Sequence, residues 1–516
     1  MEILYTLFSY IATALLLIFT LFSLFILRIF IGKSIFNKNY PPVVGTVFDQ
    51  FFYFNRLYDQ QTEMAKKHRS FRLLSPNQSE IYTTDIRNIE HILKTSFWKY
   101  SKGEHNQEIF YDLFGSGIFA VDGDKWKEQK KLASSEFSTR VLRDFSCRIF
   151  REKTAKLVRI VHGLSLTKQA FDVQGLLMKY TLDSIFKVGF GVDLNCLEGS
   201  DKEGSEFIRA FDDSNELTYW RYADPFWKLK QYLNIGSEAT LKKNIKSIHN
   251  FVDDLISTKR RQMEMQQHCN DKEDILSRFL EESKKNPQKM TNQYLRDIIL
   301  SFMIAGKDTT ANSLSWFIYM LCKNPIIHEK IAKEVGEIIS STPWNEASTV
   351  DDFVECITDE ALEEMHYLHA ALTETLRLYP AVPVDGRCTE TDDTLPDGFK
   401  LKKGDGVYYM AYAMGRMNYI WGDDAEDFRP ERWLKNGIFQ PESPFKFIAF
   451  NAGPRTCLGK DFAYRQMKIV SAALVHFFRF KLENNTENVT YRTMITLHIK
   501  GGLNIHALPR IGSVKV

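Results

Sequence analysis

Phe450-Asn451-Ala452-Gly453-Pro454-Arg455-Thr456-Cys457-Leu458-Gly459 is a glycine-rich loop with a single cysteine, and an apolar segment of helical period follows it. Unpaired backbone N–H groups and the positive end of the helix dipole lower the pKa of a thiol at such a position. The thiolate is a strong ligand for iron. A cysteine near glycines is more often a small buried hydrophobe, so the interpretation depends on the whole pattern.

The pattern Phe-x-x-Gly-x-Arg-x-Cys-x-Gly resembles the haem loop of the cytochrome P450 superfamily. The resemblance implies that Cys457 ligates the iron of haem b. Gly453 lets the chain bend under the flat macrocycle, and Gly459 lets the next helix approach it closely. Arg455 can pair with a haem propionate, and Phe450 can shield the sulfur from water.

Composition suits one large apolar domain. The chain has 516 residues and a net charge of +2, which gives no nucleic-acid signature. Its 39 Phe, 22 Tyr and 8 Trp suit a large apolar interior or ligand cavity. The seven cysteines lack C-x-x-C spacing, which argues against a zinc site or a disulfide framework.

The N-terminus reads as a membrane segment. No charged residue occurs from Ile3 to Leu27, and roughly 20 apolar residues suffice to cross a bilayer. Arg28, Lys33 and Lys38 follow this segment, whereas only Glu2 and the α-amino group precede it, so the positive-inside rule predicts that the rest of the chain lies in the cytosol. A cleaved signal peptide is the competing interpretation, but its apolar region is shorter and follows positive charge.

Three regions are therefore expected. Residues 1–27 form the anchor, residues 28–45 a basic, proline-containing hinge, and residues 46–516 the haem domain. We expect the anchor to hold the protein in the endoplasmic reticulum membrane, with the catalytic domain on the cytosolic face.

Most of the haem domain has helical periodicity, and short strand signals occur at its edges. Helices are predicted at 126–131, 141–164, 173–189, 237–263 and 275–283. Strands are predicted at 69–74 and 80–84, which Ser75-Pro76-Asn77 joins as a hairpin, and at 400–411, 480–482 and 489–506, with Gly501-Gly502 as a second hairpin turn. This predicts a mainly α fold with small β-sheets, which is also the fold that the resemblance implies.

A long helix is predicted from Thr291 to Lys323, ended by Asn324-Pro325. Its centre, Ala305-Gly306-Lys307-Asp308-Thr309-Thr310, contains poor helix formers, and such a local violation indicates a functional site. Gly306 leaves room for a small ligand such as dioxygen. A Thr hydroxyl that bonds back to the carbonyl four residues earlier can open the helix.

The same segment resembles the P450 oxygen-activation motif. By that resemblance Asp308 and Thr309 are catalytic proton-relay residues, because an acid beside a hydroxyl can deliver protons during oxygen activation. A kinked core helix with a solvated Asp is the alternative.

Glu374-Thr-Leu-Arg377 places two charges on one helix face, and Arg432 follows in Phe428-Arg429-Pro430-Glu431-Arg432-Trp433. Alone, Glu374 and Arg377 form an ordinary surface pair. In the family these motifs form a buried triad beneath the haem loop, so Glu374, Arg377 and Arg432 are expected to have a scaffold role.

Three more residues map onto propionate-binding positions. Trp126 is an expected hydrogen-bond donor, and Lys130 stands where the family has arginine, so it lacks the bidentate fork. Arg387 occupies the second position. Solvated lysines are the plainer interpretation of scattered basic residues nearby.

Within the superfamily, two stretches resemble plant fatty-acid ω-hydroxylases: 113–126 and 421–433. The pocket is expected to include Phe114, Ile118, Phe302, Val384 and Thr496, and its lining to extend to Ile299, Met303 and Leu497. Trp220, Tyr222, Phe226 and Trp227 could rest in the membrane interface or pack internally.

The resemblance implies a plant haem-thiolate monooxygenase that inserts one oxygen atom of O2 into a C–H bond of a long-chain fatty acid, at the ω or a near-terminal position. NADPH–cytochrome P450 reductase supplies electrons, with cytochrome b5 as a second donor. The alternatives are a P450 acting on a terpenoid or sterol, a haem-thiolate hydroperoxide isomerase, and a non-catalytic haem-binding protein.

Overall fold

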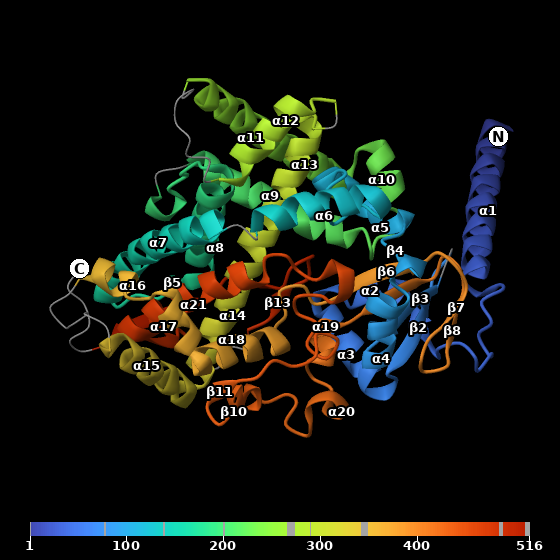
Figure 1. The fold of residues 1–516 in the computed structure, drawn as a ribbon. Coiled ribbons are helices and arrows are strands. Elements are labelled where there is room, and N and C mark those ends of the chain that lie inside the picture. Colours follow the sequence, from blue (N-terminus) through green and yellow to red (C-terminus); the bar gives the residue numbers. More distant parts are fainter. Residues whose placement is uncertain are drawn as a thin grey trace.

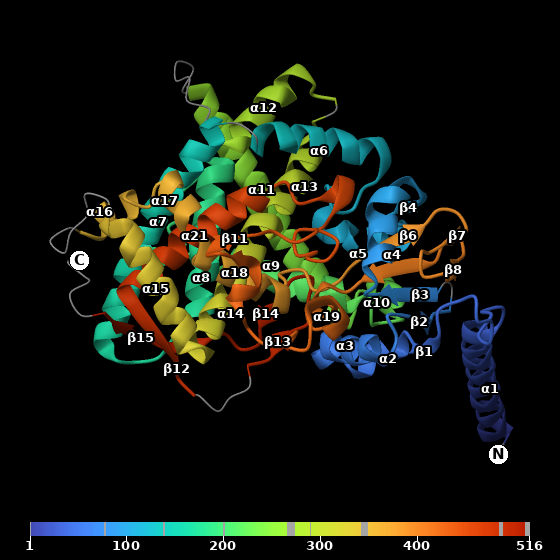
Figure 2. The same ribbon diagram turned by 60° about the horizontal axis from the view of Figure 1, so that its bottom comes forward.

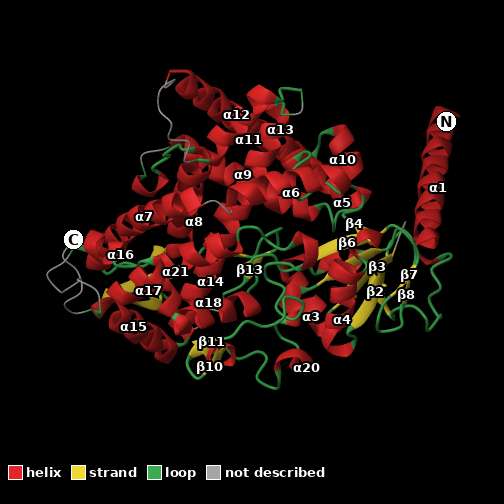
Figure 3. Cartoon of the chain, viewed as in Figure 1, coloured by secondary structure: helices red, strands yellow, loops and turns green. Residues whose placement is uncertain are grey.

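The computed structural model describes residues 2–76, 79–137, 140–199, 202–265, 274–288, 290–341, 349–484 and 489–510. Helices make up most of these residues, and the largest sheet lies at one side of the molecule (Figures 1 and 3). The predicted mainly α architecture with small sheets is confirmed. The six cysteines that the structure describes are all free, and Cys269 lies outside the described residues.

The first helix, α1 (Glu2–Phe30), stands beside the rest of the molecule in two views (Figures 1 and 2). Its segment Ile3–Phe30 is long and apolar enough to cross a membrane, and none of its most apolar window is buried. The expected hinge ends earlier than residue 45, because Val43–Thr46 forms strand β1 and pairs with β2.

The other α-helices follow in chain order. They are α2 (Phe48–Phe52), α3 (Leu57–Lys67), α4 (Ile86–Glu90), α5 (Glu104–Phe114), α6 (Gly123–Phe137), α7 (Arg140–Thr167), α8 (Val173–Ile185), α9 (Lys202–Trp220), α10 (Trp227–Leu233), α11 (Gly236–Met265), α12 (Ile275–Lys285), α13 (Asn292–Met303), α14 (Thr309–Lys323), α15 (Pro325–Ser340), α16 (Val350–Glu355), α17 (Asp359–Glu364), α18 (His366–Leu378), α19 (Ala411–Met414), α20 (Asn418–Trp421) and α21 (Lys460–Phe477). The predicted helices at 126–131, 141–164, 237–263 and 275–283 lie within them, whereas the one predicted at 173–189 ends as α8 at Ile185 and continues as the π-turn η4 (Phe186–Phe190).

The largest sheet has the order β1-β2-β3-β9-β6-β4, and the remaining strands form four small sheets. The strands are β2 (Ser70–Leu74), β3 (Ser79–Thr83), β4 (Tyr100–Ser101), β5 (Phe171–Asp172), β6 (Asp385–Thr389), β7 (Asp393–Thr394), β8 (Lys400–Leu401), β9 (Gly406–Tyr409), β10 (Leu434–Lys435), β11 (Ile438–Phe439), β12 (Phe478–Leu482), β13 (Tyr491–Arg492), β14 (His498–Ile499) and β15 (Asn504–Pro509). The predicted β2–β3 hairpin is present, with antiparallel pairing.

The predicted hairpin at Gly501-Gly502 is wrong. The two glycines do form a turn with positive φ, but the strands on either side enter different sheets. β14 pairs with β13, whereas β15 pairs with β12 and β5. A glycine pair specifies a reversal of the chain but not the partner of the strand that follows.

The predicted long helix crosses the core as α13, the π-turn η6 (Ile304–Asp308) and α14. The Thr291 side chain caps its first turn, and Asn324 ends it. α14 is buried on nearly every side and packs against α8, α18 and α21. The 3₁₀ turn η8 (Gly453–Arg455) belongs to the cysteine loop and precedes α21.

Candidate active site

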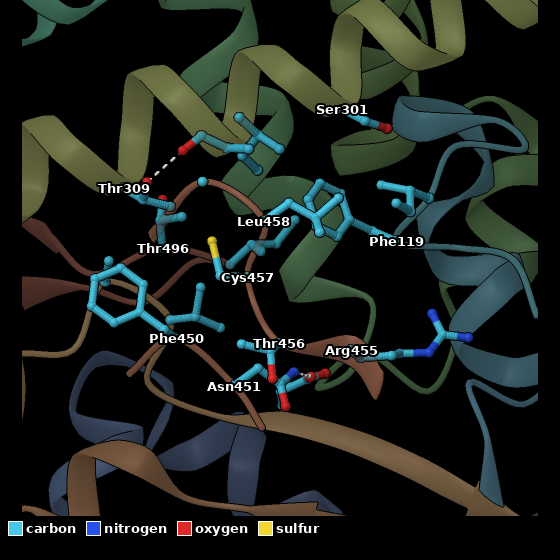
Figure 4. Close-up of a pocket in the computed structure, with 18 of the residues that line it drawn as sticks. Phe119, Ser301, Thr309, Phe450, Asn451, Arg455, Thr456, Cys457, Leu458 and Thr496 are labelled. Atoms are coloured by element: carbon cyan, nitrogen blue, oxygen red, sulfur yellow. Dashed lines mark hydrogen bonds between the residues drawn. The ribbon is translucent and has the colours of Figure 1, made fainter. Parts of the chain in front are cut away.

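A cavity of about 390 Å³ separates the long helix from the cysteine loop. The helix side contributes Ala305, Gly306 and Thr309, and the loop side contributes Phe450 and Cys457. In Figure 4 the sulfur of Cys457 points into this space, toward the side on which Thr309 and Thr496 lie. The two motifs that were separated by about 150 residues in the chain therefore face each other across one cavity.

The cysteine loop is shaped by one glycine and one backbone hydrogen bond. Gly453 has φ of +66°, and a Cβ built there would clash with the carbonyl oxygen of Leu93. The Cys457 N–H donates to the Phe450 carbonyl oxygen at 2.8 Å and closes the loop. Gly459 has no such requirement, because its φ is −90° and a Cβ there would come no nearer than 4.0 Å to the Cys457 sulfur.

The pKa of the Cys457 thiol shifts in the direction opposite to the expectation. Burial raises the pKa of its thiol, and this effect outweighs the opposing hydrogen bond from the Gly459 N–H at the start of α21. The sequence shows that a helix begins after this cysteine, which lowers the pKa of the thiol, but it does not show how far the fold removes the thiol from water.

The π-turn lies where the poor helix formers occur. The Thr309 hydroxyl donates to the Ala305 carbonyl oxygen at 2.5 Å, as the sequence predicts. Gly306 lines the cavity but also meets α8: a Cβ there would lie 2.7 Å from the Ile185 Cδ1. The absence of a side chain at Gly306 therefore allows close helix packing as well as room at the cavity wall.

Asp308 does not line the cavity, although its neighbour Thr309 does. Its carboxylate is fully buried and accepts hydrogen bonds from Lys307 Nζ at 2.7 Å and from Asn215 Nδ2 at 2.9 Å. Burial alone would raise the pKa of Asp308, but the Lys307 ammonium and His498 outweigh it and hold the pKa well below its ordinary value. Asp308 is thus an ion-paired carboxylate that lies outside the cavity lining.

Cationic side chains gather at one end of the cavity. Arg387, Lys130 and Arg455 line it together with Trp126, and the Arg455 guanidinium lies 4.5 Å from the centre of the Trp126 ring. Lys130 Nζ donates to the carbonyl oxygen of Pro454. Sequence reasoning missed Lys102, whose Nζ bonds to Asp385 Oδ1 at 2.7 Å. No motif marks Lys102, because the fold alone brings it to this end.

These cations fit the two propionates of haem b. Within the described residues, the ion pairs of Lys102, Lys130, Arg387 and Arg455 involve two carboxylates, those of Asp385 and Asp122, so these pairs leave two of the four positive charges unbalanced.

The lowered pKa values of two of these cations also indicate that few anions lie near them. Burial and the neighbouring Arg387 lower the pKa of Lys102 to about 8, and burial and Arg387 lower that of Arg455 to about 10. Arg387 is 1% exposed, and its Nε and Nη2 have no hydrogen-bond partner within the described part of the chain. Buried guanidinium donors require acceptors, which carboxylates supply best.

Glu374, Arg377 and Arg432 lie together in the core. Both guanidiniums reach Glu374: Arg377 donates to its two oxygens at 2.7 Å, and Arg432 Nε donates at 2.8 Å. The Trp433 Nε1–H also donates to it at 2.9 Å. The interpretation as an exposed surface pair is therefore excluded, because Glu374 and Arg377 are almost completely buried.

The expected pocket residues fall into two groups. Phe114, Ile118, Phe302, Val384 and Thr496 all line the cavity. Ile299, Met303 and Leu497 do not line it, and each is at most 1% exposed within the hydrophobic core. The helix is apolar on several faces here, so its periodicity could not identify the face that meets the cavity.

The four aromatic residues expected near a membrane interface, at and after the end of α9, also differ in their surroundings. Trp220 packs on Phe54 at 4.6 Å between ring centroids, and Trp227 is buried beneath Arg221. Tyr222 lines the cavity, whereas Phe226 is 54% exposed. Only Phe226 of this group is free to meet a membrane interface.

Comparison with known proteins agrees with this geometry. The family model described as Cytochrome P450 matches residues 39–504. Cytochrome P450 704C1 of Pinus taeda is 51% identical over 486 residues, which cover 92% of this chain and 93% of the relative. Cytochrome P450 704B1 of Arabidopsis thaliana is 44% identical over 497 residues (91% and 94%), and Cytochrome P450 94A1 of Vicia sativa is 36% identical over 437 residues (83% and 81%).

Proposed function

Since the chain belongs to the cytochrome P450 family, we propose that it hydroxylates a long-chain fatty acid at or near its terminal carbon. As a member of that family the protein is a haem-thiolate monooxygenase. Haem b supplies the activation of dioxygen and the insertion of one oxygen atom into a C–H bond. The observation that carries the proposal is the cavity itself, with Cys457 on one wall and Thr309 on the other.

Cys457 is proposed as the iron ligand. Its sulfur points into the cavity, and the cations at one end would supply partners for both propionates. Trp126, Lys130, Arg387 and Arg455 would hold the propionates. The test is the ferrous carbonyl spectrum: we expect the red-shifted Soret band of sulfur ligation in the native protein and its loss in Cys457→Ser. A band that persists in Cys457→Ser would remove Cys457 from this role.

The chain of the substrate is proposed to lie along the apolar part of the cavity. Phe114, Ile118, Phe302 and Val384 supply apolar surface there. Lining residues from α2, α3 and β3 lie on the side of the molecule where α1 stands (Figures 1 and 2). Terminal C–H bonds are the strongest in a fatty acid, so terminal selectivity requires such positioning.

Turnover of a lipid panel tests the substrate. Microsomes that contain the protein and a reductase would receive fatty acids of increasing length, a terpenoid and a sterol, with products located by mass spectrometry. We expect terminal or near-terminal hydroxylation of a fatty acid. Turnover of terpenoid or sterol alone would refute the proposed substrate, and products formed without NADPH and oxygen would indicate an isomerase.

Thr309 is proposed to hold a proton donor at the cavity wall, and Asp308 to supply the proton. In Thr309→Ala the hydroxyl is lost, so we expect several-fold more hydrogen peroxide per NADPH consumed. Thr309→Ser keeps the hydroxyl and is the control. Unchanged coupling in Thr309→Ala would exclude Thr309 from proton delivery.

We propose an NADPH-dependent reductase as the electron donor, with cytochrome b5 as a second donor, and the cytosolic face of the endoplasmic reticulum as the location. α1 supports membrane attachment by its length and composition. Removal of residues 1–30 is expected to release the protein from membranes, which fractionation measures.

A further inference from the structure

We propose that protons reach the cavity along four hydrogen-bonded side chains, Asp212, Lys307, Asp308 and Thr496, and that the Thr496 hydroxyl is the last donor. The inference rests on the proposed monooxygenase mechanism. It gives Thr496, otherwise expected only to contact substrate, a part in proton delivery.

The four side chains come from three separate regions of the chain and meet at η6, which contains Lys307 and Asp308. Lys307 Nζ lies 2.6 Å from Asp212 Oδ1 on α9 and 2.7 Å from Asp308 Oδ1. The Thr496 hydroxyl, on the segment between β13 and β14, donates to Asp308 Oδ2 at 3.4 Å. Asn215 Nδ2 donates to both Asp308 Oδ2, at 2.9 Å, and Thr496 Oγ1, at 3.2 Å, and so aligns them.

Burial shows that the series has an outer and an inner end. The Asp212 side chain is 19% exposed, whereas Lys307 and Asp308 are completely buried. Thr496 lines the cavity and Asp308 does not. Figure 4 shows Thr496 and Thr309 on the side of the cavity toward which the Cys457 sulfur points. Within the described residues, the bonded path from Asp308 to the cavity therefore passes through Thr496.

The charges of the series balance during transfer. At rest Asp308 is ionised and Lys307 is protonated between two carboxylates, which raise the pKa of Lys307 despite its burial. His498 also faces Asp308, with Nε2 3.7 Å from Oδ2.

Each transfer moves one proton one position inward. Lys307 gives a proton to Asp308 as it receives one from Asp212, which takes its own proton from water, so the ammonium is kept. Asp308 passes the proton to Thr496 Oγ1 as Thr496 releases its own hydroxyl proton into the cavity, and only O–H and N–H bonds change. The Thr496 oxygen can accept from Asn215 and Asp308 while donating once, which is the full capacity of a hydroxyl.

The inner end is tested with Thr496→Val and Thr496→Ser. Valine keeps the shape and removes the hydroxyl, so we expect several-fold more peroxide per NADPH, whereas serine restores native coupling. Substrate binding measured by the spectral shift should change by less than about threefold in both variants. Native coupling in Thr496→Val, or failure of Thr496→Ser to restore it, would overturn the proposal.

A second readout does not involve turnover. The infrared carboxylate band of Asp308, assigned by its loss in Asp308→Asn, should shift in resting Thr496→Val and remain in place in Thr496→Ser. An unshifted band in Thr496→Val would show that the bond to Asp308 is absent, which also overturns the proposal.

The outer end has a matched pair of variants. Asp212→Asn removes the outer carboxylate, so we expect increased peroxide release. Asp213→Asn changes the adjacent residue, whose carboxylate pairs with Arg492 outside the series, and should leave coupling native. Equal coupling in the two variants would overturn the outer half of the path. If fatty acids fail and another lipid is turned over, the same comparisons are made with that lipid, so that an incorrect substrate is distinguished from an incorrect proton path.

Discussion

Two clusters of buried charge differ in where their hydrogen bonds lead. In the first, Glu374 accepts from Arg377, Arg432 and Trp433, and Arg377 also donates to the carbonyl oxygens of Ala425 and Asp427. These hydrogen bonds therefore join groups of the protein interior to one another. In the second, Lys307 and Asp308 connect a partly exposed Asp212 with the cavity-lining Thr496. We therefore propose a scaffold role for the closed network and a proton path for the open one.

The largest effect is expected from Glu374→Ala in the closed cluster. Two buried guanidiniums would lose their shared carboxylate, which costs about 3–5 kcal/mol of unfolding free energy. We also expect loss of haem during purification. Denaturant unfolding and the ratio of haem absorbance to protein measure both.

The matched control is Glu431→Ala, because Glu431 pairs with Lys330 and its side chain is 42% exposed. Its loss should cost less than about 1 kcal/mol. Equal stability of Glu374→Ala and Glu431→Ala would contradict the scaffold role.

Lys307→Met tests the open cluster. It should lower the unfolding free energy by about 3 kcal/mol, somewhat less than Glu374→Ala, because Asp212 can turn to solvent. The pH dependence should reverse in this variant. In the native protein the lowered pKa of Asp308 contributes stability above the unfolded pKa, and that stability is lost as the pH falls through the folded pKa. Without Lys307, burial dominates and the folded pKa rises above the unfolded one.

Lys307→Met should therefore gain unfolding free energy as the pH falls below neutrality, where the native protein gains none from Asp308. Denaturant unfolding at several pH values measures this. A parallel pH dependence in the two proteins would show that Lys307 does not control Asp308.

The smallest effect concerns two glycines of the cysteine loop. Gly453→Ala requires a left-handed backbone and meets the Leu93 carbonyl, so we expect a cost of about 1–2 kcal/mol and weaker haem retention. Gly459→Ala meets neither obstacle and should change stability by less than about 0.5 kcal/mol. A larger effect at Gly459 would indicate that the approach of α21 to haem needs this glycine.

The sequence predicts correctly those features that depend on residues close together in the chain. The long helix, the β2–β3 hairpin and the back-bond from Thr309 to Ala305 follow from periodicity, turn residues and a hydroxyl near a carbonyl. Lys102 and the direction of the Asp308 side chain could not be predicted, because each depends on partners that are distant in the chain. Desolvation of the Cys457 thiol was missed for the same reason.

The pairing of β1 with β2 has a consequence for how the molecule sits on a bilayer. Arg72 on β2 also donates to the carbonyl oxygen of Lys33 at 2.9 Å, and the Lys400 N–H donates to that of Asn39 at 2.7 Å. The link after α1 is thus held along the sheet. Rotation of the globular body about α1 is therefore restricted, and with α1 as the proposed anchor the same side of the body would always face the lipid.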